Sequence, residues 1–174
     1  MSFLRDGRKN NMENYEPFNG TDSNYAGYFV SELLKKRYVL DASVISKWYY
    51  GKDEEDLYNA AAIYDNLQSK KYTFFAPDLL IFELLNIFRT KPEVSDAKIN
   101  KIINELYDLI VILGINKNTF KKAFLISRNL NISFYDSIYL SLAEDIDAGL
   151  LTADKKLFNS AKAAGINITM LSDF

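Results

Sequence analysis

The sequence predicts an α/β domain with a central parallel sheet of about five short strands flanked by helices. Short apolar segments of three to five residues alternate with longer segments in which apolar residues recur at helical spacing. The short segments are apolar throughout, which indicates strands that are buried on both faces. The chain has 174 residues, a length that suits one domain with an appendage.

In the first half of the domain, two short apolar segments are separated and followed by helical segments. Residues 38–40 read Tyr-Val-Leu and stop at an aspartate, and residues 72–75 read Tyr-Thr-Phe-Phe, so both are predicted strands. Gly51 closes the first predicted helix, and Pro77 with Asp78 starts the third. The predicted helices here cover residues 42–50, 53–69, 77–89 and 95–107.

The second half repeats this alternation. Residues 109–113 form an apolar segment, residues 150–152 read Leu-Leu-Thr, and residues 166–170 read Ile-Asn-Ile-Thr-Met. Each of these three segments is predicted to be a strand. Between and beside them lie segments with helical spacing of apolar residues. These predicted helices cover residues 117–130, 135–147 and 155–164.

The first 36 residues differ from the rest of the chain. Residues 1–36 form a polar, turn-rich stretch with scattered aromatic side chains and no charge bias, whereas regular alternation begins at residue 37. We therefore predict an N-terminal extension, residues 1–36, and a domain over residues 37–174. Two interpretations of the extension stay open: its aromatic side chains dock on the domain, or it covers a partner-binding groove.

The composition excludes most kinds of catalytic site. The chain has no Cys and no His, which removes thiolate nucleophiles, zinc ribbons, His-metal sites and imidazole acid–base chemistry. Carboxylates, hydroxyls, Lys, Arg and amides remain. If the protein is an enzyme, carboxylates that hold a hard cation are the leading option.

Charge and hydropathy bear on partners and location. The net charge of −2 gives no bulk signal for a passive nucleic-acid binder. No apolar run approaches the roughly 18 residues of a membrane span, and the first residues lack a signal-peptide hydrophobic region. We therefore predict a cytoplasmic protein that does not contact a membrane.

Three aspartates are candidates for chemistry, and each has an alternative as a helix cap. Asp41 and Asp154 each follow a predicted strand and precede a predicted helix, which is an N-cap position. Asp136 lies three residues after Ser133, so it is a candidate for the acidic member of a capping box.

Glu83 has no such alternative. It lies in the middle of a predicted helix whose other residues are apolar almost all round, which predicts burial. Asn86 follows at i+3 on the same face. A buried carboxylate without a partner costs several kcal/mol or neutralises itself, so Glu83 needs either an Arg or Lys or a cation.

The predicted fold brings these acids together. Asp41 and Asp154 follow the carboxyl ends of strands, where open α/β sheets bind ligands, and Asp136 lies in the first turn of a helix. Carboxylates ~4 Å apart repel one another by roughly 4 kcal/mol per pair at an effective dielectric of 20. An ionised cluster therefore needs cations, and oxygen ligands favour Mg²⁺, with Mn²⁺ also suitable.

Four motifs follow one another along residues 37–174. They are Val39-Leu40-Asp41-Ala42-Ser43, Phe82-Glu83-Leu84-Leu85-Asn86, Tyr135-Asp136-Ser137-Ile138-Tyr139-Leu140-Ser141-Leu142-Ala143 and Leu151-Thr152-Ala153-Asp154-Lys155-Lys156-Leu157. In this order, and on an α/β pattern that also agrees, they resemble the motifs of PIN-domain nucleases, and most of all those of the VapC-type toxins of VapBC toxin–antitoxin modules.

The resemblance implies a function and a site. The family consists of Mg²⁺- or Mn²⁺-dependent ribonucleases, often dimeric, which an antitoxin holds inactive. Its acidic quartet, which would be catalytic and metal-binding, falls on Asp41, Glu83, Asp136 and Asp154. Its supporting polar positions fall on Ser43, Asn86 and Thr152. The extension 1–36 is a departure, because compact toxins of this family start almost at the first strand.

The expected reaction is metal-dependent hydrolysis of RNA, with Asp41 as the central metal ligand and Glu83 binding or orienting water. Lys155 and Lys156 are candidates to grip the RNA backbone because they directly follow Asp154. Two alternatives stay open. The domain is a catalytically silent or self-masked interaction module, or it is an RNA-processing nuclease without an antitoxin.

Overall fold

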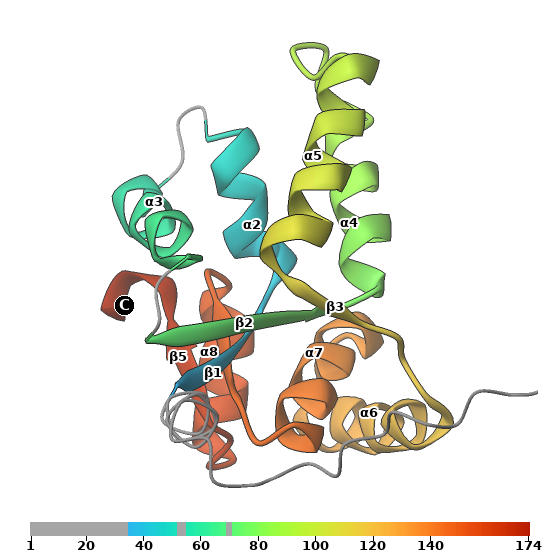
Figure 1. Cartoon of the computed structure of the whole chain (residues 1–174). Coiled ribbons are helices and arrows are strands. Elements are labelled where there is room, and N and C mark those ends of the chain that lie inside the picture. The colour runs from blue at the N-terminus through green and yellow to red at the C-terminus, as the bar shows by residue number, and fades with distance from the viewer. Residues whose placement is uncertain (1–34, 52–54, 69–70) are drawn as a thin grey trace, which may run out of the picture. The chain divides into compact units, whose positions relative to one another are not determined.

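The sheet sits at the centre of the domain. The computed structural model describes residues 35–51, 55–68 and 71–174 (Figure 1). Within these ranges five parallel strands form one sheet, in the order β3-β2-β1-β4-β5. The strands are Lys36–Leu40 (β1), Tyr72–Pro77 (β2), Val111–Leu113 (β3), Gly149–Thr152 (β4) and Ile168–Met170 (β5). The predicted fold class is confirmed.

Helices cover both faces of the sheet. Helices α2 to α5 lie on one side and α6 to α8 on the other (Figure 1). Their bounds are Ala42–Tyr49 (α2), Leu57–Asn66 (α3), Leu79–Phe88 (α4), Asp96–Leu109 (α5), Lys117–Leu130 (α6), Phe134–Asp145 (α7) and Lys155–Ala163 (α8), and a 3₁₀ turn follows at Leu171–Asp173. Each predicted helix of the domain is present, with ends shifted by a few residues.

The predicted boundary between the fourth helix of the domain and its third strand is wrong. The strand predicted from residue 109 begins instead at Val111, and Leu109 belongs to α5. The amide of Ile110 donates a hydrogen bond to the carbonyl of Leu106 at 3.0 Å, so helical hydrogen bonding continues to the end of α5. The apolar residues that suggested a longer strand serve the last turn of the helix.

The strands are buried on both faces, as their composition predicts. Leu40 and Leu151 pack into one apolar core with α2, α4 and α5, whereas their neighbours Val39 and Leu150 pack into a second core with α7 and α8. All four of these side chains are fully buried. Packing on both faces fixes the positions of β1 and β4. It therefore also fixes the start of the loops that carry Asp41 and Asp154 after these strands.

The chain adds strands first on one side of β1 and then on the other, so the strand order reverses between β1 and β4. It runs outward from β1 to β2 and β3, and then returns to add β4 on the other side of β1. The register pairs Leu40 with Leu151, and the amide of Asp41 donates to the carbonyl of Leu151 at 3.0 Å. In sheets of this kind, ligands bind beyond the carboxyl ends of the strands at such a reversal.

The predicted extension, residues 1–36, lies outside the described residues except for its last two. Lys36 is already the first residue of β1, one position before the predicted start of the domain. Among the helices that the structure describes, none is long and apolar enough to span a bilayer.

Candidate active site at the carboxyl ends of β1 and β4

Asp41 follows β1 and is buried where β1 and β4 end. It occupies the N-cap position of α2, yet its side chain makes no capping hydrogen bond. Instead Oδ2 accepts hydrogen bonds from Ser43 Oγ and Thr152 Oγ1, both at 2.6 Å. The backbone amide of Ser43 has a small lowering effect on the pKa of Asp41, but it does not form a capping hydrogen bond with this side chain. The capping alternative is therefore wrong for Asp41.

The two hydroxyl groups have fixed orientations. Ser43 Oγ accepts a hydrogen bond from the amide of Ala153, and Thr152 Oγ1 accepts one from the amide of Asp154, both at 3.0 Å. Each hydroxyl therefore has its acceptor side occupied and its proton directed at Asp41. This network ties the end of β1 to the loop after β4, and it places the two predicted supporting hydroxyls directly against the buried carboxylate.

Glu83 lies in the middle of α4 and is partly buried. Its Oε2 accepts a hydrogen bond from Tyr139 Oη at 2.6 Å, and none of the ion pairs in the described ranges involves it. The expectation that α4 is buried almost all round is wrong, because Phe82 keeps 72% of its surface exposed. The helix buries one face in the core and presents the other outward.

Asp136 is the third residue of α7, the helix that also carries Tyr139, the hydrogen-bond partner of Glu83. Ser133 caps α7 by accepting a hydrogen bond from the Asp136 amide at 3.0 Å. The reciprocal half of a capping box is absent, since the Asp136 carboxylate accepts no hydrogen bond from any described residue. Asp136 lies in the first turn of α7, a position at which the helix dipole interacts favourably with negatively charged side chains.

The three carboxylates repel one another. Burial is the main reason that the pKa of Asp41 is raised, and the charge of Asp136 raises it further despite the hydroxyl hydrogen bonds. Burial also raises the pKa of Glu83; the hydrogen bond from Tyr139 opposes this, while the charges of Asp41 and Asp136 add to it. The three acids are thus electrostatically coupled, and among the described residues hydroxyls are the side-chain partners of Asp41 and Glu83.

Asp154 behaves differently from the other three. It is exposed, and its Oδ1 accepts hydrogen bonds from the amides of Lys156 at 2.7 Å and Leu157 at 3.0 Å. The capping alternative is confirmed for this residue, which sits at the N-cap of α8. Within the described ranges, no group of three or more acids has side chains placed so that they could hold a metal ion together.

The donor set nevertheless fits a hard divalent cation. It offers only oxygen atoms, and the hydrogen bonds to Asp41 and Glu83 from side-chain hydroxyls use one oxygen of each carboxylate. Asp136 and the second oxygen of Asp154 have no such bond among the described residues. Mg²⁺ and Mn²⁺ accept such oxygens readily and keep several waters, so they tolerate an incomplete protein shell.

The remaining predicted site residues lie at the edge of this arrangement. Asn86 is exposed on α4, one turn after Glu83. Lys155 and Lys156 are both exposed at the start of α8, and Lys155 forms an ion pair with Glu55 at 3.3 Å.

One residue of the site escaped sequence reasoning. Tyr139 is 1% exposed and reads as an ordinary core aromatic, yet it is the hydrogen-bond partner of Glu83. A signal was present in the sequence: Tyr139 lies three residues after Asp136, and residues at i and i+3 share a helix face.

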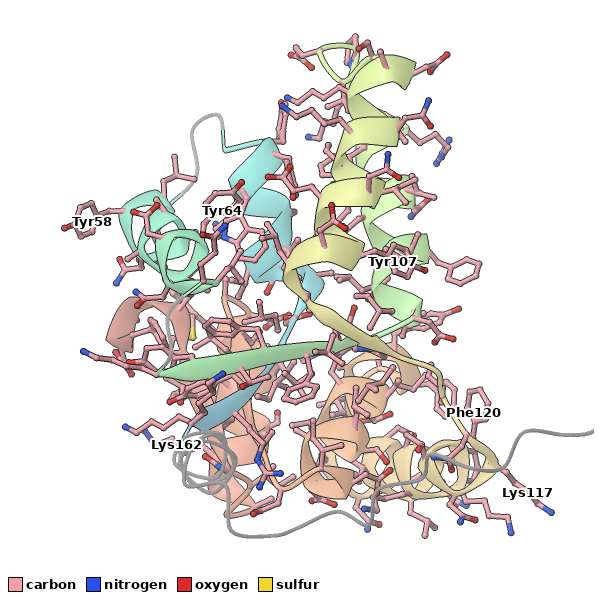
Figure 2. All side chains as sticks on the ribbon, in the orientation of Figure 1. Tyr58, Tyr64, Tyr107, Lys117, Phe120 and Lys162 are labelled. Carbon is pink, nitrogen blue, oxygen red and sulfur yellow. The ribbon has the colours of Figure 1, made fainter. Side chains whose placement is uncertain are left out.

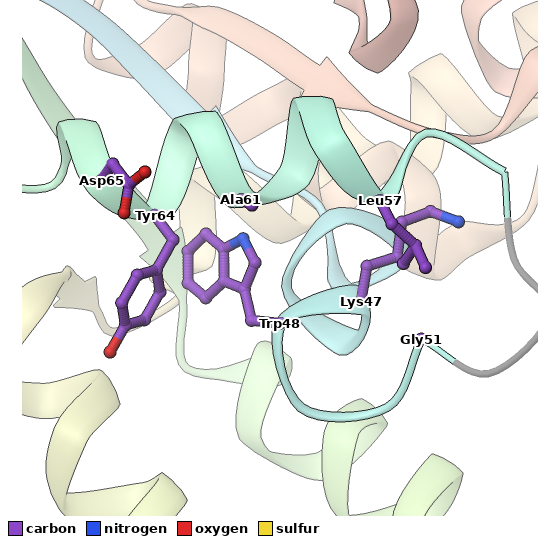
Figure 3. Close-up of a pocket in the computed structure, with 7 residues that line it drawn as sticks. All are labelled: Lys47, Trp48, Gly51, Leu57, Ala61, Tyr64 and Asp65. Atoms are coloured by element: carbon purple, nitrogen blue, oxygen red, sulfur yellow. The ribbon is translucent and has the colours of Figure 1, made fainter.

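Two apolar surfaces lie outside the acid cluster. Trp48 and Leu57 line a pocket between α2 and α3 (Figure 3), where the indole contacts the Tyr64 ring and donates to the carbonyl of Ala60 at 2.8 Å. The pocket carries a charge at two points, from Lys47 and Asp65, as Figure 3 shows.

The second surface is the α6 patch, a shallow hollow formed by Phe120, Phe124 and Leu125 on α6 with Phe134 at the start of α7. All four side chains are exposed, and the rings of Phe120 and Phe134 stack with centroids 6.4 Å apart. Figure 2 shows Phe120 and Lys117 on this outer side of the domain.

Comparisons with solved structures find the same fold in several proteins, among them a VapBC2 complex and a toxin. The PAE2754 protein of Pyrobaculum aerophilum superposes with a TM-score of 0.57 at 18% identity, covering 81% of this chain and 93% of that one. The VapBC2 complex of Rickettsia felis, bound to a promoter DNA fragment, gives 0.56 at 15% identity, with 77% and 98% covered. The Sarcin-Ricin loop cleaving toxin VapC20 of Mycobacterium tuberculosis gives 0.57 at 13% identity, with 74% and 95% covered.

At these identities the likeness concerns the fold. A comparison with curated protein sequences gives no match. The sequence profile of the PIN domain, by contrast, matches residues 38–163, which is most of the chain and includes Asp41, Glu83, Asp136 and Asp154. The chain belongs to the PIN domain family.

Proposed function

We propose that this protein is a metal-dependent endoribonuclease that hydrolyses RNA phosphodiester bonds and acts in the cytoplasm as the toxin of a type II toxin–antitoxin system. One observation carries the proposal. The charge of Asp136 raises the pKa of both Asp41 and Glu83, and the charge of Asp41 adds to the rise at Glu83. In the described part of the chain, hydroxyls rather than a Lys or Arg are the side-chain partners of Asp41 and Glu83.

A divalent cation is the partner that this cluster lacks. We assign Mg²⁺ or Mn²⁺ to Asp41, Glu83, Asp136 and Asp154, with the Asp154 carboxylate contributing through the oxygen that does not cap α8. Such an ion supplies an activated water and offsets the charge that builds on the phosphate oxygens.

The chain's own residues then have distinct tasks. The hydroxyls of Ser43 and Thr152 hold Oδ2 of Asp41 by hydrogen bonds. The Asp41 carboxylate therefore keeps its orientation while RNA binds and the product leaves. Glu83 orients the attacking water or accepts its proton, a task that suits a carboxylate whose pKa is raised by burial. Asn86, one turn along α4, is assigned a supporting contact.

The substrate is negatively charged and the cluster is too, so cations near the site are needed to hold RNA. Lys156 is exposed at the start of α8, and no ion pair in the described ranges involves it. Lys155 is engaged with Glu55 on the surface, a contact that contributes little and is easily exchanged for a phosphate. We assign both lysines to the RNA backbone.

We further propose an antitoxin as a protein partner. Fold relatives include a VapBC2 toxin–antitoxin complex, which favours the same kind of partner here. The pocket at Trp48 between α2 and α3 offers the apolar surface that an antitoxin segment needs (Figure 3).

We also propose a homodimer. The α6 patch joins exposed aromatic and aliphatic side chains from two helices, and contiguous apolar surface of this kind is typical of protein interfaces. It begins at Phe134, two residues from Asp136, so dimerisation through it would bring the partner close to the acid cluster.

A second candidate is a catalytically silent or self-masked interaction module. The observation in its favour is that Asp154 is engaged in capping α8, so no three acids of the described residues already form a metal site. An RNA-processing nuclease without an antitoxin is the other alternative, and a neighbouring antitoxin gene would argue against it.

The test is an RNA cleavage assay on the full chain with Mg²⁺, with Mn²⁺ and with EDTA. We expect cleavage with either metal and none with EDTA or in the Asp41→Asn variant. Cleavage that persists in EDTA, or in Asp41→Asn at the parental rate, would contradict the ribonuclease assignment. Metal binding without any cleavage would favour the interaction module.

A further inference from the structure

We infer that Tyr139 is a positioning residue for Glu83, which it holds beside Asp41 and Asp136; the inference rests on the proposed role of these acids as a cation site. Tyr139 is 1% exposed, in the interior of α7. Its hydroxyl donates to Glu83 Oε2 at 2.6 Å, a distance typical of a strong hydrogen bond to a carboxylate.

The bond joins side chains of two different helices, α4 and α7. Glu83 is carried by α4 and Asp136 by α7, and the two helices lie on opposite faces of the sheet. Because Tyr139 and Asp136 are three residues apart on α7, they share one face of that helix. The single Tyr139–Glu83 bond therefore sets where the Glu83 carboxylate lies relative to Asp136.

A hydroxyl is the right donor for this task. A Lys or Arg would orient Glu83 equally well, but it would also cancel the negative charge that attracts a cation. A phenol orients the carboxylate and leaves its charge in place. Ser43 and Thr152 treat Asp41 in the same way, so both buried acids have one oxygen held by neutral donors.

A merely structural explanation makes a different prediction. A buried tyrosine hydroxyl needs an acceptor, and Glu83 could serve only to satisfy it. In that case removal of the hydroxyl would change the stability of the fold and leave the cation site as it was. Under the positioning role, removal leaves the ring packing intact and frees the Glu83 side chain.

The experiment compares Tyr139→Phe with Tyr49→Phe in the full chain. Tyr49 is the last residue of α2 and also keeps its hydroxyl buried, so the control removes the same group from a tyrosine that does not bond one of the acids of the site. Mn²⁺ affinity is measured without RNA by titration calorimetry, and kcat and KM are measured on RNA. We expect Tyr139→Phe to weaken Mn²⁺ binding and kcat by about 10- to 100-fold, with KM changed less, and Tyr49→Phe to change none of them.

A double-mutant cycle tests whether Tyr139 acts through Glu83. Glu83→Gln keeps an acceptor for the phenol but removes the charge. If Tyr139 works through Glu83, the double variant binds Mn²⁺ no more weakly than Glu83→Gln alone. Additive losses would overturn the inference, and so would unchanged Mn²⁺ affinity in Tyr139→Phe.

The outcomes also separate this inference from the proposed function. A parent protein that binds Mn²⁺ but does not cleave RNA ends the ribonuclease proposal, while the binding measurements still decide the role of Tyr139. A parent that binds no Mn²⁺ overturns both. If Tyr139→Phe does not fold, crystal structures of the parent and of Glu83→Gln decide. A side chain at position 83 that does not accept a hydrogen bond from the Tyr139 hydroxyl, in either structure, contradicts the inference.

Discussion

Helix α7 carries an acid at each end, and the two ends differ in how the negative charge is met. At the last turn, Asp145 accepts hydrogen bonds from Lys122 and from Thr119, the latter at 2.9 Å. Burial works against its charged form, but these two partners outweigh it and lower the pKa of Asp145. At the first turn, Asp136 stands beside Asp41 and Glu83, whose pKa values are raised.

We interpret this difference as one between an acid that stabilises the fold and acids that we propose bind a cation. Asp145 is compensated by a cation of the chain itself, so its charge stabilises the contact between α6 and α7. In the part of the chain that the structure describes, the side-chain partners of Asp41 and Glu83 are hydroxyls, which orient a charge without cancelling it. Such a site costs stability in the free protein, as functional sites often do, and gains it back when a cation binds.

The largest expected effect comes from removing the charge of Asp41. Asp41→Asn keeps an oxygen for the Ser43 and Thr152 hydroxyls but lowers the affinity of the site for a cation. Loss of metal catalysis costs several kcal/mol of transition-state stabilisation, which is about a thousandfold in rate for ~4 kcal/mol. The measurement is kcat/KM on RNA with saturating Mn²⁺.

Asp145→Asn is the matched control, because it makes the same chemical change at the other end of α7. It breaks the ion pair with Lys122, at an expected cost of about 1 kcal/mol in the free energy of unfolding. Cleavage should be unaffected. Equal loss of activity in the two variants would break the contrast between the two ends.

A smaller effect is expected from the hydroxyls. Thr152 and Thr119 are both buried, and each donates to a carboxylate, Asp41 or Asp145. Thr152→Val should lower metal-dependent cleavage about tenfold or more, because it frees one side of Asp41. Thr119→Val should lower only the unfolding midpoint. Cleavage assays and thermal denaturation on both variants give the comparison directly.

The two ends should also respond oppositely to pH in the metal-free protein. Asp41 and Glu83 have pKa values raised above 3.8 and 4.5, so the folded state holds their protons more tightly than the unfolded state does. Their contribution to stability is present at low pH and is lost as pH rises through the raised values. Asp145 contributes above 3.8 and loses its contribution as pH falls through its lowered pKa.

Thermal denaturation in EDTA between acidic and neutral pH tests these signs. Asp41→Asn should raise the unfolding midpoint at neutral pH relative to the parent, and Asp145→Asn should lower it. If Asp41→Asn instead has a lower unfolding midpoint than the parent at neutral pH, the buried charge of Asp41 is already compensated in the parent. Mn²⁺ should raise the parent midpoint and leave Asp41→Asn almost unchanged.

The smallest expected effect concerns RNA binding. Lys156→Ala removes one cation beside the acids, so KM should rise a few-fold with kcat unchanged, and the dependence of log affinity on log salt should weaken by about one charge. Lys117→Ala, on the exposed side of α6, is the control (Figure 2). Equal effects of the two substitutions would mean that neither contact is specific to the site.

Much of the fold could be predicted because its signals are local. The strands are apolar and the helices repeat their apolar residues at helical spacing, so the elements and their order followed from the sequence. The boundary between α5 and β3 could not, because residues 109–113 are apolar whether they end a helix or begin a strand.

The sequence indicates which acids belong to the candidate site, but it does not predict the contacts that their side chains make. Asp41 and Asp154 look alike in sequence, as each follows a strand and precedes a helix. Tertiary structure separates them: hydroxyls from β4 and α2 capture Asp41, while Asp154 turns to the amides of its own helix. Tyr139 was missed because a buried tyrosine in an apolar helix is more often core than a partner of a carboxylate.

The central claim is that Asp41, Glu83 and Asp136 form a binding site for a divalent cation, which comes from the solvent. The most direct test is calorimetric titration of Mn²⁺ into the metal-free parent, Asp41→Asn and Asp145→Asn, without RNA. We predict saturable binding to the parent and to Asp145→Asn, and binding lost in Asp41→Asn. Equal affinity in the parent and Asp41→Asn, or no binding to any of them, would contradict the claim.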